Sequence, residues 1–130
     1  MRPPLHIGSR AVRARTFPEK DVAAYRSLSG DDGLRFGAPG PSVPGPLLAG
    51  MVSDLLGTEL PGEGTMWMKQ EMRFGSAAPI GTRVEATVEV IRLRPDKGLV
   101  DLACRCEADG AVVLEGRSLV LVPDLAARLG

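Results

Sequence analysis

The segment from Gly45 to Gly57, GPLLAGMVSDLLG, constrains the fold more than any other part of the chain. Its large apolar residues follow a helical period rather than a strand period. They are Leu47, Leu48, Met51, Val52, Leu55 and Leu56. At about 100° per residue they cover roughly half of the helix circumference. Pro44 and Pro46 suit the first turn, and Gly57 is the expected end. We expect a helix surrounded by other structure; the alternative is an ordinary amphipathic helix on one face of an α+β sheet.

Four strands are predicted after this helix, joined by hairpin connections into an antiparallel meander. Their ranges are 65–74, 82–94, 99–108 and 111–122. A change of phase at Val90–Ile91 predicts a bulge, and Asp109-Gly110 is typical of a tight hairpin turn. A strand over 5–16 and a helix over 16–29 come first, with Thr16 and Glu19 at capping-box spacing. The sequence predicts one domain over 1–130, with a sheet curled around the central helix.

The methionines of one predicted strand and the two cysteines of another are expected to be buried. The 65–74 strand places Met66, Met68, Gln70, Met72 and Phe74 on one face. We expect its methionines in the core, although such a surface would also suit a flexible acyl chain. The neighbouring thiols of the 99–108 strand are too poorly placed for a disulfide, and they are predicted to be small buried hydrophobes.

Composition excludes several classes of function. The chain has sixteen basic and sixteen acidic residues, and this balance argues against a nucleic-acid-binding protein. No apolar run is long enough to span a membrane, and no secretory leader is evident, so a cytoplasmic location is expected. Two cysteines and one histidine do not form a recognisable metal site, and we expect no metal or cofactor.

The stretch from Gly30 to Pro46 has the most unusual composition, with five glycines and four prolines. A loop this long in a compact domain is usually functional or disordered. It ends where the N–H groups and dipole of the central helix can stabilise negative charge. We therefore interpret it as a functional loop, with an ordinary surface loop as the alternative.

Short segments in a particular order resemble the MaoC-like family, which includes the (R)-specific enoyl-CoA hydratases. They are Asp21-Val22, Ser29-Gly30-Asp31, Gly45 with Leu47-Leu48, Leu60-Pro61-Gly62, Phe74 with Ala78-Pro79-Ile80-Gly81, and Asp109-Gly110. The resemblance runs from about Phe17 to Pro123. It implies the hot-dog fold and a dimer whose sheet continues across two protomers.

The resemblance also implies a chemistry. Such enzymes add water across the double bond of a trans-2-enoyl thioester, or run the reverse dehydration. An Asp and a His in a D-x-N-P-x-H arrangement activate the water, and a backbone N–H at the start of the central helix polarises the thioester carbonyl. The resemblance assigns the catalytic position to Asp31, and the oxyanion and substrate contacts to Gly45, Phe36 and Leu47. Asp31 could also be a turn residue at a helix end.

The chain departs from this motif at its histidine. Phe36 occupies the histidine position, Gly33 and Leu34 replace the Asn and Pro, and Pro44 precedes Gly45 where the family usually has His. His6 is the only histidine, and it lies outside the motif.

Three functions remain open at this point. The first is a hydratase or dehydratase that relies on Asp31. The second is a non-catalytic subunit or acyl-CoA binder, paired with a catalytic hot-dog chain. The third is a thioesterase with Asp54 as its acid, although a solvated or interface role for Asp54 is favoured. The expected ligand is a thioester of coenzyme A or acyl carrier protein. The candidate residues for binding its phosphates are Arg35, Lys69 and Arg73.

Overall fold

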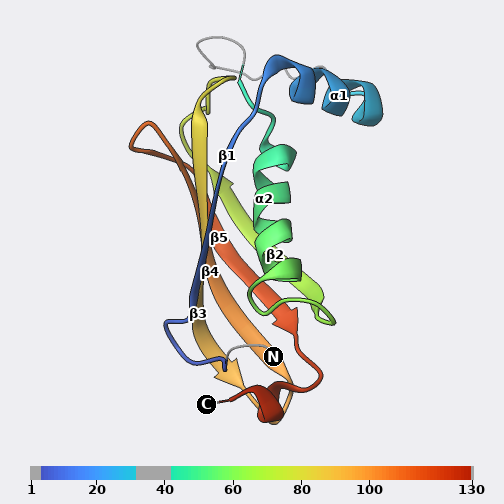
Figure 1. The fold of residues 1–130 in the computed structure, drawn as a ribbon, viewed down its shortest axis with the longest axis vertical. Helices are drawn as coiled ribbons and strands as arrows, with labels where there is room; N and C mark the ends of the chain where they lie inside the picture. Colours follow the sequence, from blue (N-terminus) through green and yellow to red (C-terminus); the bar gives the residue numbers. More distant parts are fainter. Residues whose placement is uncertain (1–3, 32–41, 130) are drawn as a thin grey trace.

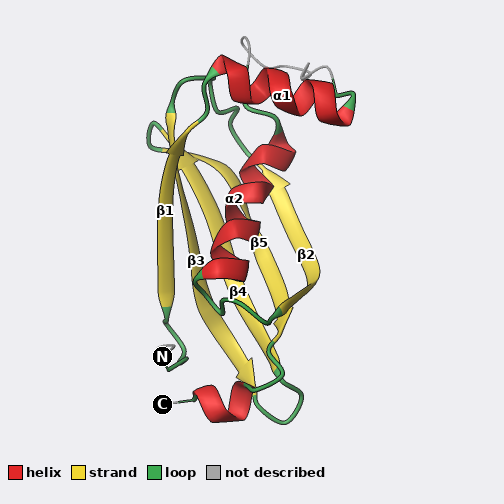
Figure 2. Cartoon of the chain, turned by 45° about the vertical axis from the view of Figure 1, so that its right-hand side comes forward, coloured by secondary structure: helices red, strands yellow, loops and turns green. Residues whose placement is uncertain are grey.

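A five-stranded antiparallel sheet with one helix along its face forms the body of the protein (Figure 1). The computed structural model describes residues 4–31 and 42–129. The strands are β1 (Arg10–Thr16), β2 (Met66–Phe74), β3 (Arg83–Arg94), β4 (Leu99–Ala108) and β5 (Ala111–Leu121). Helix α2 (Gly45–Thr58) runs along one face of the curved sheet, and α1 (Glu19–Ser29) projects at one end (Figure 2). The predicted α+β architecture around a central helix is confirmed.

The strand order is β1-β3-β4-β5-β2, so the predicted four-strand meander is wrong. Strands β3, β4 and β5 do form a meander, but β2 pairs with β5 at the edge of the sheet. The connection over 75–82 spans three strand spacings, roughly 14 Å, which eight residues can cover. The N–H groups of Gly75 and Ser76 donate to the carbonyls of Val113 and Val112, which hold the start of this crossing against the sheet.

The central helix buries the apolar arc that its sequence predicts. Its buried side chains are Leu48, Met51, Val52, Leu55 and Leu56. Leu47 is half-buried. The helix passes Gly57 and ends at Thr58, whose hydroxyl donates to the carbonyl of Asp54 at 2.7 Å. The helix therefore ends one residue after Gly57, the end predicted from the sequence.

Helix α1 begins at Glu19 after Pro18, and no side chain caps it. The predicted capping box is wrong because Thr16 is the last residue of β1. The predicted end is confirmed, since Gly30 adopts a left-handed conformation and its N–H donates to the carbonyl of Arg26.

A bulge in β2 overturns the predicted methionine face. Trp67 lies opposite Val120 and Lys69 lies opposite Leu119, so Met68 is the extra residue. Trp67 consequently joins the face of β2 that looks toward the helix, and Met66 falls on the other face. Met66 and Met68 are 58% and 53% exposed, so they are not core residues of this chain.

Elsewhere the local predictions hold. The register of β3 shifts between Val90 and Arg92, which confirms the bulge, and Asp109 and Gly110 both have positive φ in the β4–β5 turn. Strand β4 alternates as expected, and Cys104 and Cys106 are free and buried.

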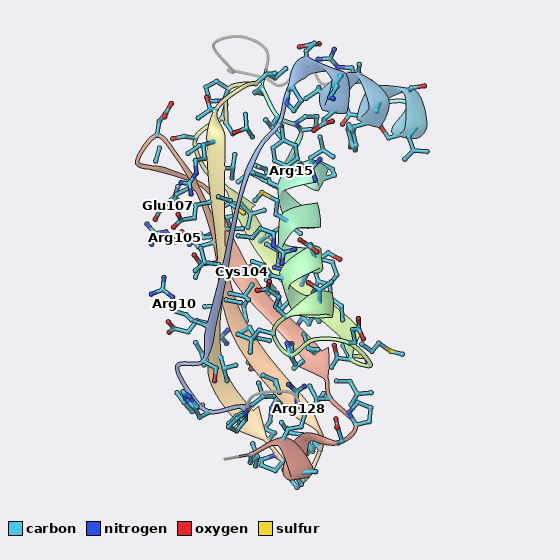
Figure 3. The ribbon with its side chains drawn as sticks, in the orientation of Figure 1. Arg10, Arg15, Cys104, Arg105, Glu107 and Arg128 are labelled. Atoms are coloured by element: carbon cyan, nitrogen blue, oxygen red, sulfur yellow. The ribbon has the colours of Figure 1, made fainter. Side chains whose placement is uncertain are left out.

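The face of the sheet away from α2 is charged. Figure 3 shows Arg10, Arg105 and Glu107 pointing away from the helix. Arg105 and Glu107 form an ion pair at 2.7 Å. The apolar core therefore lies between α2 and the inner face of the sheet. Within the described residues, no helix is long and apolar enough to cross a membrane.

Candidate active site

The first turn of α2 presents the positive end of a helix. Pro44 precedes the helix, Pro46 has no N–H, and the N–H of Leu47 donates to the carbonyl of Pro44. The N–H of Gly45 has no acceptor within the helix, as is general for a first turn. The first turn of α2 contains no acidic residue that would neutralise this end. A developing negative charge on a thioester oxygen would be stabilised here.

Gly45 is required for close packing at this point. A Cβ on Gly45 would lie 2.7 Å from Cε1 of Phe74. The start of α2 therefore sits directly against the aromatic ring at the end of β2. Phe74 is itself 53% exposed, so this end of the helix lies beside an uncovered apolar surface.

Asp31 follows the end of α1 and is tied to that helix twice. The hydroxyl of Tyr25 donates to Oδ2 of Asp31 at 3.1 Å. The N–H of Asp31 donates to Oγ of Ser29 at 3.0 Å, and the same hydroxyl donates to the carbonyl of Tyr25 at 2.8 Å. Both the main chain and the carboxylate of Asp31 are therefore oriented by the last turn of α1.

The histidine position of the motif, Phe36, lies outside the described residues, as do Gly33, Leu34 and Arg35. His6 is exposed, and its Nδ1 lies 2.9 Å from the carbonyl oxygen of Ile7. Its neighbour Leu5 forms a bridge with Leu129, at the end of the sheet opposite α1 (Figure 1). His6 therefore cannot act with Asp31 within one protomer.

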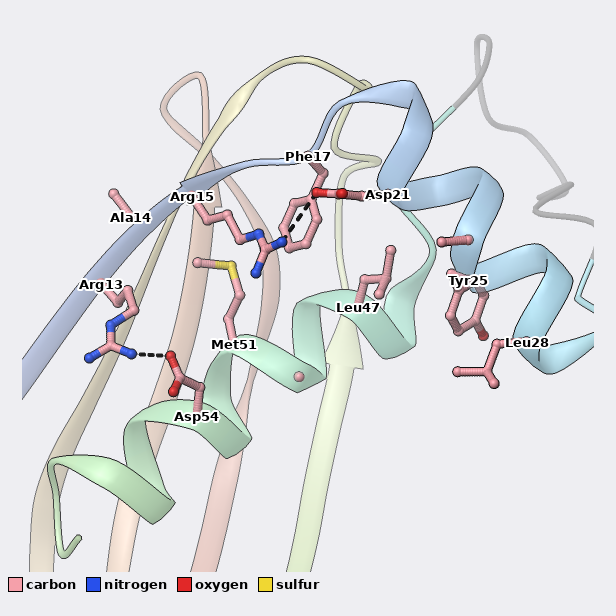
Figure 4. A pocket seen from close by; sticks show the side chains of 12 residues that line it. Arg13, Ala14, Arg15, Phe17, Asp21, Tyr25, Leu28, Leu47, Met51 and Asp54 are labelled. Atoms are coloured by element: carbon pink, nitrogen blue, oxygen red, sulfur yellow. Dashed lines mark hydrogen bonds and ion pairs between the residues drawn. The ribbon is translucent and has the colours of Figure 1, made fainter.

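An open groove of about 590 Å³ separates β1 and α1 from α2 (Figure 4). Its lining residues are Arg13, Ala14, Arg15, Phe17, Asp21, Ala24, Tyr25, Leu28, Leu47, Gly50, Met51 and Asp54. The groove brings the predicted residue Leu47 together with Tyr25, which holds Asp31. Gly45 and Asp31 do not line it.

Two arginines of β1 line this groove from the helix-facing side of the sheet. Arg13 and Arg15 lie opposite the buried residues Ala86 and Val84, so they share the helix-facing side of the sheet. Arg13 bonds to Asp54 of α2 and to Glu59. These two carboxylates raise the pKa of the Arg13 guanidinium above its usual value. Arg15 pairs with Asp21 at 3.2 Å and lies 5.1 Å from the centre of the Phe17 ring.

Asp54 therefore acts as a partner of Arg13 in the structure. Asp54 is partly exposed and forms this ion pair within one chain, and its predicted solvated or interface role stays a prediction. The remaining phosphate-binding candidates are also engaged, since Lys69 pairs with Glu71 and Arg73 pairs with Glu115. Sequence reasoning missed the Tyr25–Asp31 and Arg13–Asp54 contacts. The i, i+6 spacing across the end of α1 was the available signal for the first.

The buried thiols are poor nucleophiles. Burial raises the pKa of Cys106 to about 12, with a further contribution from Cys104. Burial also raises the pKa of Cys104, against hydrogen bonds that lower it. Among the described residues, no group of three or more His, Cys, Asp or Glu side chains could hold a metal ion.

Comparison with known proteins decides the family. No protein-family model matches the chain. An (R)-specific enoyl-CoA hydratase of Aeromonas caviae is 34% identical over 129 residues, covering 92% of this chain and 96% of the relative. The chain belongs to the MaoC-like family of (R)-specific enoyl-CoA hydratases. A 3-hydroxybutyryl-CoA dehydratase of Methylorubrum extorquens is 33% identical over 97% of the chain and 90% of its own length.

Solved structures confirm the hot-dog fold of this enoyl-CoA hydratase-like protein. The (R)-hydratase from A. caviae involved in PHA biosynthesis has a TM-score of 0.84 and 36% identity, covering 92% of this chain and 98% of that one. A chain of the ChsH1-ChsH2 complex from Mycobacterium tuberculosis has a TM-score of 0.77 at 12% identity, which shows the fold alone. The chain is thus a hot-dog protein of the enoyl-CoA hydratase and dehydratase family.

Proposed function

We propose that this hydratase-family protein catalyses the reversible addition of water to a trans-2-enoyl thioester, with Asp31 as its only acid–base side chain. The observation that carries the proposal is the retention of the motif Asp, held at the end of α1, in a chain that aligns with (R)-specific hydratases over nearly its whole length. The similarity to a 3-hydroxybutyryl-CoA dehydratase and to (R)-specific enoyl-CoA hydratases supports a coenzyme A thioester as the substrate.

The proposed reaction balances with one carboxylate. Asp31 accepts a proton from water while the water oxygen bonds to C3 and the electron pair of the double bond moves toward the thioester oxygen. The N–H of Gly45 stabilises that oxygen. The Asp31 carboxylic acid then returns the proton to C2. Because one acid–base group is missing relative to the full motif, we expect a rate about 10²–10⁴-fold below that of an intact site.

Product analysis tests the reaction class. Crotonyl-CoA incubated with the purified protein should yield (R)-3-hydroxybutyryl-CoA, identified by chiral chromatography, without release of free thiol. Free thiol from butyryl-CoA would instead support a thioesterase. Neither product from a folded protein would contradict the proposal.

A second function, a non-catalytic subunit or acyl-thioester binder, is favoured by one observation. Phe36 stands where the motif has histidine, and His6 lies at the other end of the sheet. Turnover that appears only in a Phe36→His variant, or only with a second hot-dog chain present, would support this candidate.

We also propose that the protein dimerises through β2. This strand pairs with β5 alone among the described strands, and Met66, Trp67, Met68 and Phe74 are exposed along it. Antiparallel pairing of two β2 edges would make one ten-stranded sheet, with the two copies of β1 at its outer edges. His6 of the partner subunit would then lie on the far edge, too distant to replace the motif histidine.

The cytoplasmic location stays a prediction from the sequence.

A further inference from the structure

We infer that Tyr25 is a positioning residue that orients the Asp31 carboxylate for proton transfer. This inference rests on the proposed function. Tyr25 is half-buried, lines the groove beside Leu47, and donates its hydroxyl proton to Oδ2 of Asp31 at 3.1 Å. Tyr25 therefore links the groove to Asp31.

The location of Asp31 explains why such a donor is needed. Asp31 follows Gly30, which ends α1, so its carboxylate lies near the negative end of that helix. A carboxylate in this position is disfavoured in its charged form. A hydroxyl that donates to it stabilises the charge and fixes its direction.

Ser29 fixes the main chain of Asp31, and Tyr25 fixes the side chain. The Ser29 hydroxyl accepts from the Asp31 N–H and donates to the Tyr25 carbonyl. The main chains of Tyr25 and Asp31 are therefore linked through Ser29. In the full motif, a histidine contributes to holding and activating the water with the aspartate. Tyr25 gives this chain a way of orienting Asp31 that does not involve a histidine.

The charged residues that line the groove with Tyr25 are paired with one another. Arg15 of β1 pairs with Asp21 of α1, and Arg13 of β1 pairs with Asp54 of α2. Neither ion pair involves Tyr25, so a Tyr25 variant keeps both. Removal of the Tyr25 hydroxyl should therefore act mainly on Asp31.

The first test uses Tyr25→Phe, with Ser27→Ala as the control because it removes an exposed hydroxyl from the same helix. We expect kcat for crotonyl-CoA hydration to fall about tenfold at neutral pH with KM changed less than about twofold, and the acid limb of the pH–rate profile to move to higher pH. In an Asp31→Asn background, Tyr25→Phe should cause no further loss. Equal losses in both backgrounds would overturn the inference.

The second test does not depend on activity. Titration of the Asp31 carboxyl by ¹³C NMR, with and without Tyr25→Phe, should show its pKa raised by about one unit in the variant. An unchanged Asp31 titration would overturn the inference even if the protein hydrates enoyl thioesters. A shifted titration in a protein without turnover would retain the Tyr25–Asp31 contact and reject the hydratase function.

Discussion

At the scale of single residues, the buried thiols make stability depend on alkaline pH. The pKa of Cys106 is raised to about 12 in the folded protein, against a usual value near 9. An acid whose folded pKa is raised stabilises the fold fully below its unfolded pKa, and that stabilisation is lost as pH rises through the window from 9 to 12.

The prediction is a loss of roughly 2 kcal/mol in unfolding free energy from Cys106 alone between about pH 8 and pH 10.5. Urea denaturation at the two pH values measures it. A Cys106→Ala variant, although less stable overall, should lose less over the same interval. An equal pH dependence in both proteins would assign the effect to other groups.

At the scale of secondary-structure elements, two glycines should respond oppositely to alanine. Gly57 lies inside α2, and a Cβ there would meet open space, so Gly57→Ala should stabilise the protein by about 0.5–1 kcal/mol. Gly116 of β5 is close to β2, and its Cβ would lie 1.9 Å from the carbonyl oxygen of Glu71. Gly116→Ala should therefore destabilise the protein by more than about 2 kcal/mol.

Urea denaturation of both variants gives the comparison. The new Cβ at Gly116 would clash with main-chain atoms of Glu71. The clash can be removed only if strands β2 and β5 move apart. A Gly116→Ala protein as stable as the wild type would show that β2 does not pack against β5 at this position.

Individual elements show what could be predicted from sequence. The β4–β5 turn was predictable because Asp109 and Gly110 carry a local signal for positive φ. The apolar arc of α2 was predictable because its period is local. The pairing of β2 with β5 was not, because the choice of neighbour depends on where a connection crosses the sheet. The bulge at Met68 has no turn residue to mark it, so Met66 was wrongly predicted to share a face with Gln70 and Phe74.

The candidate site divides in the same way. Asp31 and Gly45 came from a family pattern, whereas Tyr25 entered the site through a local contact six residues away and Arg13 through a contact between distant parts of the chain. Arg13 was not predictable because a charged residue on a strand normally indicates the solvent face. Here the strand lies at the edge, where a long side chain can extend past α2 to reach its carboxylates.

At the scale of the whole molecule, the exposed edge of β2 predicts self-association. Met66→Lys places a charge on this edge and should weaken the dimer at least about tenfold, because unpaired charge there opposes pairing. Val12→Lys is the matched control, since Val12 is 46% exposed on the opposite edge strand β1. Sedimentation equilibrium measures both. Dissociation caused by Val12→Lys alone would place the interface on β1 instead.

The decisive measurement is the loss of enoyl absorbance during crotonyl-CoA hydration by the wild type, Asp31→Asn and His6→Ala. We predict measurable turnover in the wild type, unchanged turnover in His6→Ala, and a loss of at least about 10²-fold in Asp31→Asn. Turnover that survives in Asp31→Asn, or that disappears in His6→Ala, would contradict a hydration reaction carried by Asp31 alone.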